Sequence, residues 1–462
     1  MKISNTLSGH IEDFVPLQAD GVRMYSCGPT VYSFAHIGNF RTFVFIDLLK
    51  RYLRYQGYPV FHVMNITDVD DKTIRNSQAA EPKKLREYTD VYTRAFFEDC
   101  DLLQIQLPEK VVLATDHVPE MVALIQRLKE KGHTYEKDGS VYFKISTFQE
   151  YGKLSKLDAE GILAGARVDV DEYDKQDARD FVLWKAARND EPHWDSPFGP
   201  GRPGWHIECS AMSMKYLGES FDIHCGAVDL IFPHHENEIA QSEGATGRPF
   251  VRYWVHGEHL IVDGEKMAKS KGNFYTLRDL LEKGIDPYQV RYALQSVPYR
   301  RQLNFTFDLL RQSESSLQRL EDCRLALVTA KSGPGSNPQI QALHQSMLIA
   351  FERAMDDDLN TAQALAAIFD WVRELNIAVA EGMLLQDDCT SALQAMQRIN
   401  EVLVLWRPLP ESPDEEIRKL IEARNLARKS KNFALADQIR EQISKLGYII
   451  EDTKEGVRWK KQ

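Results

Sequence analysis

Hydrophobic positions near the start of the chain form two short runs separated by a helical repeat. The first run covers residues 22–26 and ends at Cys27, and apolar residues then recur with a helical period from Phe43 to Leu53. A second apolar run occupies residues 60–64. A strand, a helix and a second strand in this order make a β-α-β unit, so the pattern predicts a parallel sheet.

Two stretches rich in proline, glycine and serine divide the chain into three parts. They cover residues 331–338 and 408–416, and such breaker-rich stretches are typical of linkers. Between them the apolar pattern is helical throughout. The last part begins with a helical pattern at 417–424 and ends in a segment, 448–450, that favours β structure. We therefore expect an α/β region, an all-helical region and a small C-terminal region.

The composition is that of an ordinary globular protein, with 43% hydrophobic and 27% charged residues among 462. The net charge of −11 argues against a surface that binds nucleic acid everywhere, but it leaves room for a local basic patch. Residues 412–462 carry 12 basic and 9 acidic residues, a net of +3, whereas the other residues carry 45 and 59, a net of −14. A solvated helical face explains such an excess as often as a binding surface does.

Neither a signal-peptide core nor an apolar run of about 20 residues occurs in the sequence, so we expect a soluble, intracellular protein without membrane contact. Six cysteines are scattered without C-x-x-C spacing, which excludes a disulfide framework. Most of them are expected to be small buried residues, with Cys27 and Cys209 as exceptions.

The junction between the first strand and its helix, residues 27–39, is the first candidate site. Such a turn of a parallel sheet offers free backbone N–H groups and the positive end of a helix to an anion. Gly38 allows a ligand close to the backbone, while His36 and Asn39 offer side-chain donors. The alternative is that these residues only cap the helix.

A lysine-rich segment at residues 264–273 is the second candidate. Lys266, Lys269 and Lys271 lie between two glycines, which indicates a mobile cationic loop that can fold over a polyphosphate; the alternative is a solvated basic turn. Together the two motifs resemble the HIGH and KMSKS signatures of class I aminoacyl-tRNA synthetases. This resemblance implies that His36, Asn39, Lys266 and Lys269 bind ATP with Gly38 and stabilise charge on its phosphates.

A third pattern offers ligands for a metal ion. If Pro233 lies in the first turn of a helix, His234 and Glu238 are on one face at i, i+4. With Cys27 and Cys209 they supply two thiolates, an imidazole and a carboxylate, a set that suits Zn²⁺. The same spacing on its own is more often a surface pair on a helix.

From Tyr25 to its C-terminus the chain resembles the cysteinyl-tRNA synthetase family. Further runs that match the family occupy residues 65–72, 165–169, 180–185 and 355–361. The resemblance implies an α/β protein with a Rossmann-like parallel-sheet catalytic domain at 1–310, which carries a connective insertion at about 115–205 and a stem-contact region at about 274–310. An all-helical domain at 311–407 and an anticodon-binding domain at 412–462 are expected to follow.

The family resemblance implies one zinc ion per chain, held by Cys27, Cys209, His234 and Glu238 and bound by the thiolate of the substrate. With four protein ligands the ion either becomes five-coordinate or the carboxylate of Glu238 loosens, and the sequence leaves both open. Zinc separates cysteine from serine because it binds a thiolate far better than a hydroxyl. ATP is expected to enter with Mg²⁺.

Further substrate contacts follow from the same resemblance. The cysteine pocket is expected to contain Thr67, Trp205, His224 and Asp229, while His235 either lines it or supports it from behind. The tRNA contacts are expected at Arg424, Arg428, Asp437 and Trp459, although Trp459 is equally explained as a packing residue. The expected partners are tRNA-Cys, ATP and L-cysteine, and the expected state is a cytoplasmic monomer.

Four positions depart from the family pattern. Asn39 replaces a histidine, Ala268 replaces a serine of the lysine loop, and Cys225 and Ala227 interrupt a common glycine run.

Two other functions compete with tRNA charging. A ligase of mycothiol biosynthesis resembles the same core but lacks an anticodon module, and a non-catalytic paralogue would bind tRNA or zinc only.

Overall fold

The computed structural model of the chain describes residues 1–80, 84–157, 180–188, 191–330, 332–408, 415–430, 432–446, 448–453 and 456–461. The family-like run at 165–169, most of the second linker and the side chain of Trp459 lie outside what is described. The chain forms two compact units, Met1–Leu405 and Trp406–Gln462.

A five-stranded parallel sheet forms the centre of the first unit. Its strands, in spatial order, are β11 (Val251–Gly257), β10 (Phe221–Ala227), β3 (Val22–Ser26), β4 (Val60–Ile66) and β5 (Lys110–Leu113). Helix α1 (Ile37–Tyr55) connects β3 to β4, so the predicted β-α-β unit is confirmed. Strand β4 pairs with one edge of β3, and β10 pairs with the opposite edge. The strand order therefore reverses between β3 and β10, where open α/β sheets bind ligands.

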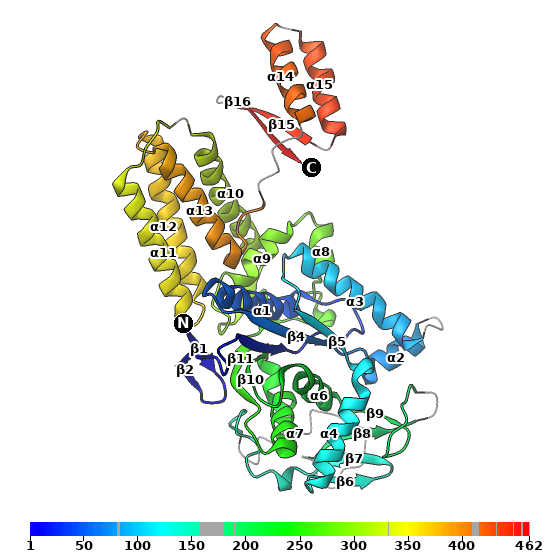
Figure 1. Cartoon of the computed structure of the whole chain (residues 1–462). Coiled ribbons are helices and arrows are strands. Elements are labelled where there is room, and N and C mark those ends of the chain that lie inside the picture. The colour runs from blue at the N-terminus through cyan, green and yellow to red at the C-terminus, as the bar shows by residue number, and fades with distance from the viewer. Residues whose placement is uncertain are drawn as a thin grey trace. The chain divides into compact units, whose positions relative to one another are not determined.

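Helices cover both faces of this sheet. Figure 1 shows α1 on one side and α6 (Trp205–Leu217) and α7 (Glu236–Thr246) on the other. Two further helices, α2 (Asp71–Ala79) and α3 (Leu85–Leu102), lie between β4 and β5 in the sequence. A covered sheet of this kind needs strands that are apolar on both faces, and four of the five residues of β3 are buried.

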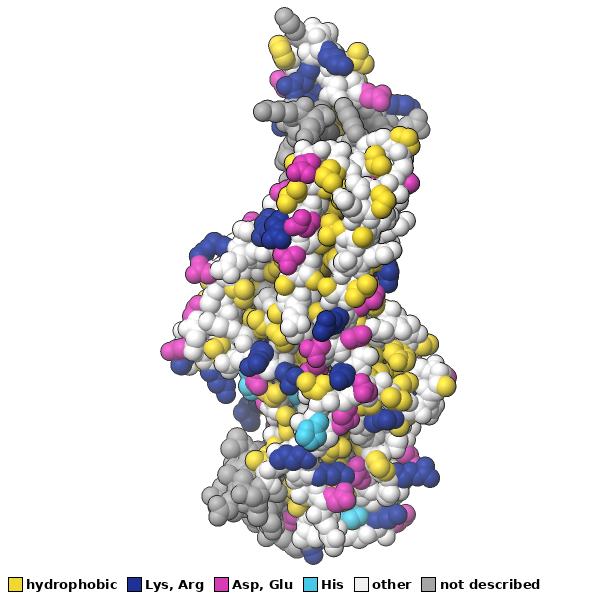
Figure 2. All heavy atoms as spheres, turned by 90° about the vertical axis from the view of Figure 1, so that its left-hand side faces the viewer, with side chains coloured by type: hydrophobic (Ala, Val, Ile, Leu, Met, Phe, Trp, Pro, Cys, Tyr) yellow, Lys and Arg dark blue, Asp and Glu magenta, His cyan; other side chains and the backbone are white. Residues whose placement is uncertain are grey.

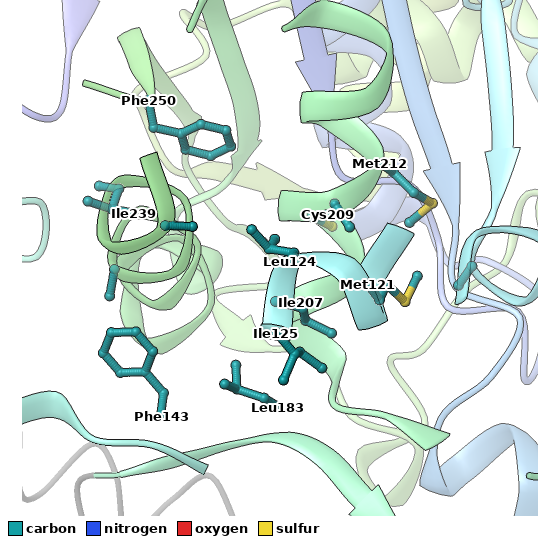
Figure 3. Close-up of a cluster of buried hydrophobic side chains, with 14 of the residues drawn as sticks. Met121, Leu124, Ile125, Phe143, Leu183, Ile207, Cys209, Met212, Ile239 and Phe250 are labelled. Atoms are coloured by element: carbon teal, nitrogen blue, oxygen red, sulfur yellow. The ribbon is translucent and has the colours of Figure 1, made fainter. Parts of the chain in front are cut away.

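An insertion separates β5 from β10. It contains α4 (Val118–Glu130) and a four-stranded antiparallel sheet of β6 (Thr134–Lys137), β7 (Ser140–Phe143), β8 (Phe181–Ala186) and β9 (Gly201–Pro203). Figure 3 shows side chains of α4, such as Leu124, beside Ile207 and Met212 of α6 and Ile239 of α7. Cys209 belongs to the same buried cluster. The apolar core thus holds α6 and α7 in place beside the sheet.

The rest of the first unit is mostly helical. A small sheet of β12 (Leu260–Val262), β13 (Glu265–Lys266) and β14 (Leu303–Phe305) accompanies the short helices α8 (Leu277–Glu282) and α9 (Pro287–Gln295). Four longer helices follow: α10 (Phe307–Thr329), α11 (Pro338–Asp356), α12 (Thr361–Ala380) and α13 (Gln386–Leu403). Helix α13 packs on α1 and α11. At its start the chain forms a hairpin of β1 (Lys2–Asn5) and β2 (His10–Asp13).

The second unit is a helical hairpin with a β-hairpin. Helices α14 (Glu415–Lys429) and α15 (Phe433–Lys445) precede strands β15 (Tyr448–Thr453) and β16 (Gly456–Lys461), which pair antiparallel. Ile417, Ile439 and Ile443 are in its small buried core. The β segment expected at 448–450 is therefore confirmed and extended.

Charges of both signs are mixed on the face of the molecule that Figure 2 shows. Lys and Arg side chains are interspersed there with Asp and Glu. Within the described parts of the chain, helices lack the combination of length and apolarity that crossing a membrane requires. All six cysteines are free and buried.

Candidate functional site

A cleft opens at the carboxyl ends of β3, β4 and β10. Its volume is about 380 Å³, and it is lined by residues that follow these three strands. Cys27 and His36 come after β3, Thr67 comes after β4, and Asp229 comes after β10. The cleft therefore occupies the switch point of the parallel sheet and joins the first candidate motif to the others.

His36 and Asn39 cap α1 at the edge of this cleft. The backbone N–H of Asn39 donates to His36 Nδ1 over 3.2 Å, and the N–H of His36 donates to Asn39 Oδ1 over 3.0 Å. Burial, together with the nearby charge of Lys269, lowers the pKa of His36 to about 4, although Asp229 acts in the opposite direction. The ring is neutral near pH 7, and because Nδ1 accepts a hydrogen bond, its proton is on Nε2. His36 thus caps the helix and still has one N–H donor to offer.

Packing in the same turn explains why position 38 is a glycine. A Cβ atom at this position would lie 2.9 Å from His36 Nδ1 and 3.2 Å from the Met267 methyl carbon. Glycine therefore leaves room for the capping histidine and for the lysine loop. Gly38 itself is not among the residues that line the cleft.

The lysine loop reaches the cleft through Lys269. The ammonium of Lys269 lies 5.0 Å from the ring centroid of Phe274, and both residues line the cleft. The loop is joined to the first motif where the Ile37 N–H donates to the Tyr275 carbonyl over 2.9 Å. Lys266 is exposed in β13 and is not among the lining residues. The two motifs, about 230 positions apart, are therefore adjacent in space.

The four proposed metal ligands converge at the floor of the cleft, where Cys27, Cys209 and His234 line it and Glu238 lies beneath them. The sulfur atoms of Cys27 and Cys209 are 3.8 Å apart, and Cys27 Sγ is 3.9 Å from Glu238 Oε1. His234 Nε2 is 3.1 Å from the same carboxylate oxygen. These residues come from the β3 end, from α6, and from α7 with the turn before it.

One detail of the predicted local structure is wrong. Regular helix α7 begins at Glu236, and Pro233 lies in a preceding irregular turn, Ile231–His235. Phe232 in that turn has φ −135° and ψ 130°, an extended conformation that no regular helix accommodates. His234 and Glu238 still meet, because the turn returns to helical geometry after Phe232.

Burial and mutual contacts set the charges of this cluster. Burial alone would raise the pKa of Cys209, but hydrogen bonds to Cys27 and His234 lower it to about 6. Burial opposes the charge on His234, yet its contacts with Cys209 and Glu238 raise its pKa to about 10. Burial likewise opposes the Glu238 carboxylate, and His224 and His234 lower its pKa to about 2. The buried Cys209 thiolate and the Glu238 carboxylate therefore give the cluster a negative charge that suits a bound cation.

Three further histidines, His235, His256 and His224, lie around the cluster. His235 Nε2 is 3.3 Å from Cys27 Sγ, and its Nδ1 is 2.8 Å from His256 Nε2. The ligand atoms that all lie within 4.8 Å of one another belong to Cys27, His234, His235 and Glu238, so this group contains His235 and does not include the predicted ligand Cys209. His224 does not line the cleft; its Nε2 is 2.9 Å from Glu238 Oε2, and its side chain is fully buried behind that carboxylate.

A hydrogen-bonded series of residues fixes Thr67 at the pocket wall. Asn65 Nδ2 donates to Thr67 Oγ1 over 3.1 Å, and this hydroxyl donates to Glu208 Oε2 over 3.0 Å. One lone pair of Thr67 remains available to a substrate. Asn65 also accepts the Gly28 N–H, and a Cβ at Gly28 would lie only 1.6 Å from the Asn65 carbonyl oxygen. The Trp205 ring lies 4.2 Å from the His234 ring and also lines the cleft.

The positions that depart from the family pattern have different surroundings. Ala227 lines the cleft, whereas Cys225 is fully buried in β10. Ala268 donates its N–H to Asn273 Oδ1 over 2.8 Å, so this contact needs no serine hydroxyl. The Asn39 side chain, as described, completes the helix cap.

The expected tRNA contacts lie in the second unit. Arg428 and Asp437 are exposed on α14 and α15. Arg424 is buried, with only 3% of its surface exposed, which does not suit a direct phosphate contact. The exposed apolar residues Leu426 and Phe433 are on the same helices.

Sequence reasoning missed Asn65, Glu208 and His256. Asn65 lies in the family-like run 65–72, but nothing in the sequence marks it as a site residue, and each of the three residues acts through a neighbour. Of the three, Asn65 was the easiest to predict from the sequence, because it lies two positions before Thr67 at the end of a buried strand.

Comparison with known proteins gives concordant family matches along the chain. The model of the class I (C) tRNA synthetase catalytic domain matches residues 13–315. A DALR domain matches 350–406, and a cysteinyl-tRNA ligase anticodon binding domain matches 412–459.

Full-length relatives carry the same name. A cysteine–tRNA ligase of Solibacter usitatus is 53% identical, with all of both chains covered. One of Brachyspira hyodysenteriae is 50% identical over 99% of this chain and 98% of that protein. A solved methionyl-tRNA synthetase of Mycobacterium tuberculosis, in complex with methionyl-adenylate, aligns with a TM-score of 0.64 at 16% identity and covers 83% of this chain and 91% of that one. This likeness confirms the expected class I fold. The family matches and the full-length identity together show that the chain belongs to the cysteinyl-tRNA synthetase family.

Proposed function

We propose that the protein is a cysteine–tRNA ligase that activates L-cysteine with ATP and transfers it to the terminal adenosine of tRNA-Cys. The observation that carries this proposal is one cleft that joins a thiol-and-imidazole cluster on its floor to His36 and Lys269 at its rim. In the first step a carboxylate oxygen of cysteine attacks the α-phosphorus of ATP, and pyrophosphate leaves. In the second step a ribose hydroxyl attacks the carbonyl carbon, and AMP leaves.

The donor set at the floor fits a zinc ion. Tetrahedral Zn²⁺ with Zn–S bonds of about 2.3 Å places its sulfur ligands about 3.8 Å apart, and Cys27 Sγ and Cys209 Sγ are 3.8 Å apart. Cys27, Cys209, His234 and Glu238 would hold the ion, one per chain. When bound there, zinc supplies a soft Lewis acid that favours the thiolate of cysteine over the hydroxyl of serine. His235 lies within the same 4.8 Å of Cys27, His234 and Glu238 and is a further candidate donor.

Activation needs no nucleophile from the protein, so the residues at the rim act by position and charge. His36 offers its Nε2–H to a phosphate oxygen, and the free N–H groups at the start of α1 face the same anion. Lys269 offers its ammonium from the loop. We assign Lys266 and Asn39 to the same phosphates, the latter through the cap that orients His36, and we expect Mg²⁺ to accompany ATP.

The cysteine backbone is assigned to the side of the cleft near β4. Thr67 has a lone pair for the ammonium group, and the exposed carboxylate of Asp229 is a second acceptor. Trp205 closes the pocket beside His234. His224 supports the site indirectly by holding Glu238.

Recognition of tRNA is assigned to the second unit. The anticodon-domain match at 412–459 favours charging of tRNA over ligation to an amino sugar. We retain Arg428, Asp437 and Trp459 as contacts and regard Arg424 as a packing residue. The proposed division is a catalytic domain at 1–310, a helical domain at 311–407 and an anticodon-binding domain at 412–462, in a cytoplasmic monomer.

The deciding experiment is ATP–pyrophosphate exchange with cysteine, with serine and without an amino acid. We expect exchange with cysteine only, followed by charging of a tRNA that has a GCA anticodon. Exchange without charging would favour the amino-sugar ligase, and the absence of both would indicate a non-catalytic paralogue. Protein stripped of zinc should lose its preference for cysteine over serine; an unchanged preference would contradict the zinc assignment.

A further inference from the structure

One wall of the cleft is aromatic and takes no part in the chemistry assigned above. It consists of Tyr32 and Phe34, from the segment between β3 and α1, and Tyr92 of α3, with Lys72 of α2 beside them. All four residues line the cleft. We refer to them as the aromatic wall.

The wall is held rigidly by its surroundings. The Tyr32 carbonyl accepts a hydrogen bond from the Tyr88 hydroxyl over 2.7 Å, and the ring of Phe34 meets that of Tyr92 edge to face at 5.3 Å. Tyr92 in turn contacts Tyr88 at 5.2 Å. The loop before α1 therefore meets α3 here, beside α2.

Two cations accompany the rings. The Lys72 ammonium lies 5.4 Å from the centroid of the Tyr32 ring. The Arg278 guanidinium lies 5.1 Å from that of Phe34 and is fixed by Glu98 at 2.7 Å. Even with these neighbours, 41% of the Phe34 surface is exposed. An exposed aromatic face beside positive charge is suited to stacking on a base whose phosphate is nearby.

The position of the wall indicates which nucleotides it binds. Phe34 precedes His36 by two residues, so the two backbones are at most about 7 Å apart. We expect the adenosine of ATP near Gly226 and Ala227, the last two residues of β10, whereas the wall lies on the side of α2 and α3. The unpaired 3′ end of a tRNA must reach the same cleft for the second step, and single-stranded nucleotides bind through stacked bases and phosphate contacts.

We propose that the aromatic wall binds the unpaired 3′-terminal nucleotides of the tRNA and so positions the terminal ribose for transfer. This inference rests on the proposed function. Phe34 is the central residue, because it is the most exposed ring of the wall. Lys72 supplies a phosphate contact.

The test compares Phe34→Ala with the wild-type protein in two reactions. Loss of one stacking contact should raise the KM for tRNA in charging by about 5- to 150-fold, while cysteine-dependent pyrophosphate exchange stays unchanged. Phe34→Trp should restore charging. Phe61→Ala is the matched control, since Phe61 is 42% exposed on β4 and does not line the cleft.

A truncated tRNA locates the contact. Binding of tRNA that lacks its last three nucleotides should be equally strong to Phe34→Ala and wild-type protein, whereas the intact tRNA should bind the variant more weakly. Equal weakening of both tRNAs, a raised KM for ATP in exchange, or unchanged charging would each overturn the inference. Wild-type protein that catalyses neither reaction would instead refute the proposed function itself.

Discussion

Asp47 is a buried carboxylate in α1, the helix that His36 caps. It is 2% exposed, its Oδ2 accepts from Arg291 Nη2 at 2.6 Å and from Arg51 Nε at 2.7 Å, and its Oδ1 accepts the Gln106 N–H at 2.8 Å. Arg291 is itself 1% exposed. Although burial opposes the charge on Asp47, the two guanidinium groups lower its pKa. The pair fixes α1 to α9.

Asp47→Asn keeps the shape of the side chain and removes its charge, which leaves Arg291 buried without a counter-ion. Breaking a buried pair in this way costs about 3–5 kcal/mol. The first unit spans Met1–Leu405, and at about 2.1 cal/mol/K per residue its unfolding entropy near Tm is roughly 850 cal/mol/K. The expected decrease in Tm of that unit is therefore about 4–6 °C.

The assay is thermal unfolding followed by tryptophan fluorescence at pH 7 and at pH 3. The folded pKa of Asp47 is below its unfolded value of about 3.9, so the stabilisation is complete above that pH and is lost as the pH falls through the folded pKa. The difference between variant and wild type should therefore shrink at pH 3. Asp20→Asn is the control, because its pair with Arg23 is exposed and should cost less than about 1 kcal/mol. A decrease below 1 °C for Asp47→Asn, or one equal to that of the control, would refute the reasoning.

Three further outcomes are expected. Lys269→Ala should slow cysteine-dependent pyrophosphate exchange at least 10-fold without changing zinc content, whereas Lys271→Ala, whose ammonium pairs with Glu265 at 2.8 Å, should have little effect; equal rates for both variants would contradict the role of Lys269. A chain ending at residue 407 should keep pyrophosphate exchange but lose tRNA charging, and charging by this short chain would contradict the anticodon assignment. With the full chain, added salt should weaken tRNA binding more than it slows pyrophosphate exchange. Burial lowers the pKa of His36 to about 4 and, with Lys50, that of His62 to about 3, so the free energy of unfolding should fall as the pH drops from about 6.5 toward 4; denaturant titrations that show constant stability across this window would argue against neutral buried rings.

Sequence patterns were sufficient where local spacing determines structure. The β3-α1-β4 unit followed from apolar periodicity, and the four zinc-ligand candidates were identified from residue type and family resemblance. Capping of α1 by His36 and Asn39 is compatible with ATP binding, because the His36 ring has two nitrogen atoms and the cap uses only Nδ1. The irregular turn Ile231–His235 before α7 could not be predicted, since no propensity signals a single extended residue such as Phe232.

Other features depend on tertiary packing and leave little trace in the sequence. The contact between Thr67 and Glu208 joins residues 141 positions apart. Burial of Arg424 could not be inferred from a helical pattern of mixed charge, because its side chain shares a face with apolar neighbours. The aromatic wall is similar: Phe34 and Tyr92 belong to different elements, and only the fold brings their rings together.

The hydrogen bond between Ile37 and Tyr275 also has a mechanical consequence. This hydrogen bond ties the end of the lysine loop to the start of α1. The beginning of the loop is β13, which pairs with β12, and β12 pairs in turn with β14. Lys269 lies near the middle of this double tether, so the number of residues between the two ties sets how far its ammonium can travel. Deleting one residue from 267–274 should therefore be more damaging than most substitutions there, because it shortens the reach of the whole loop.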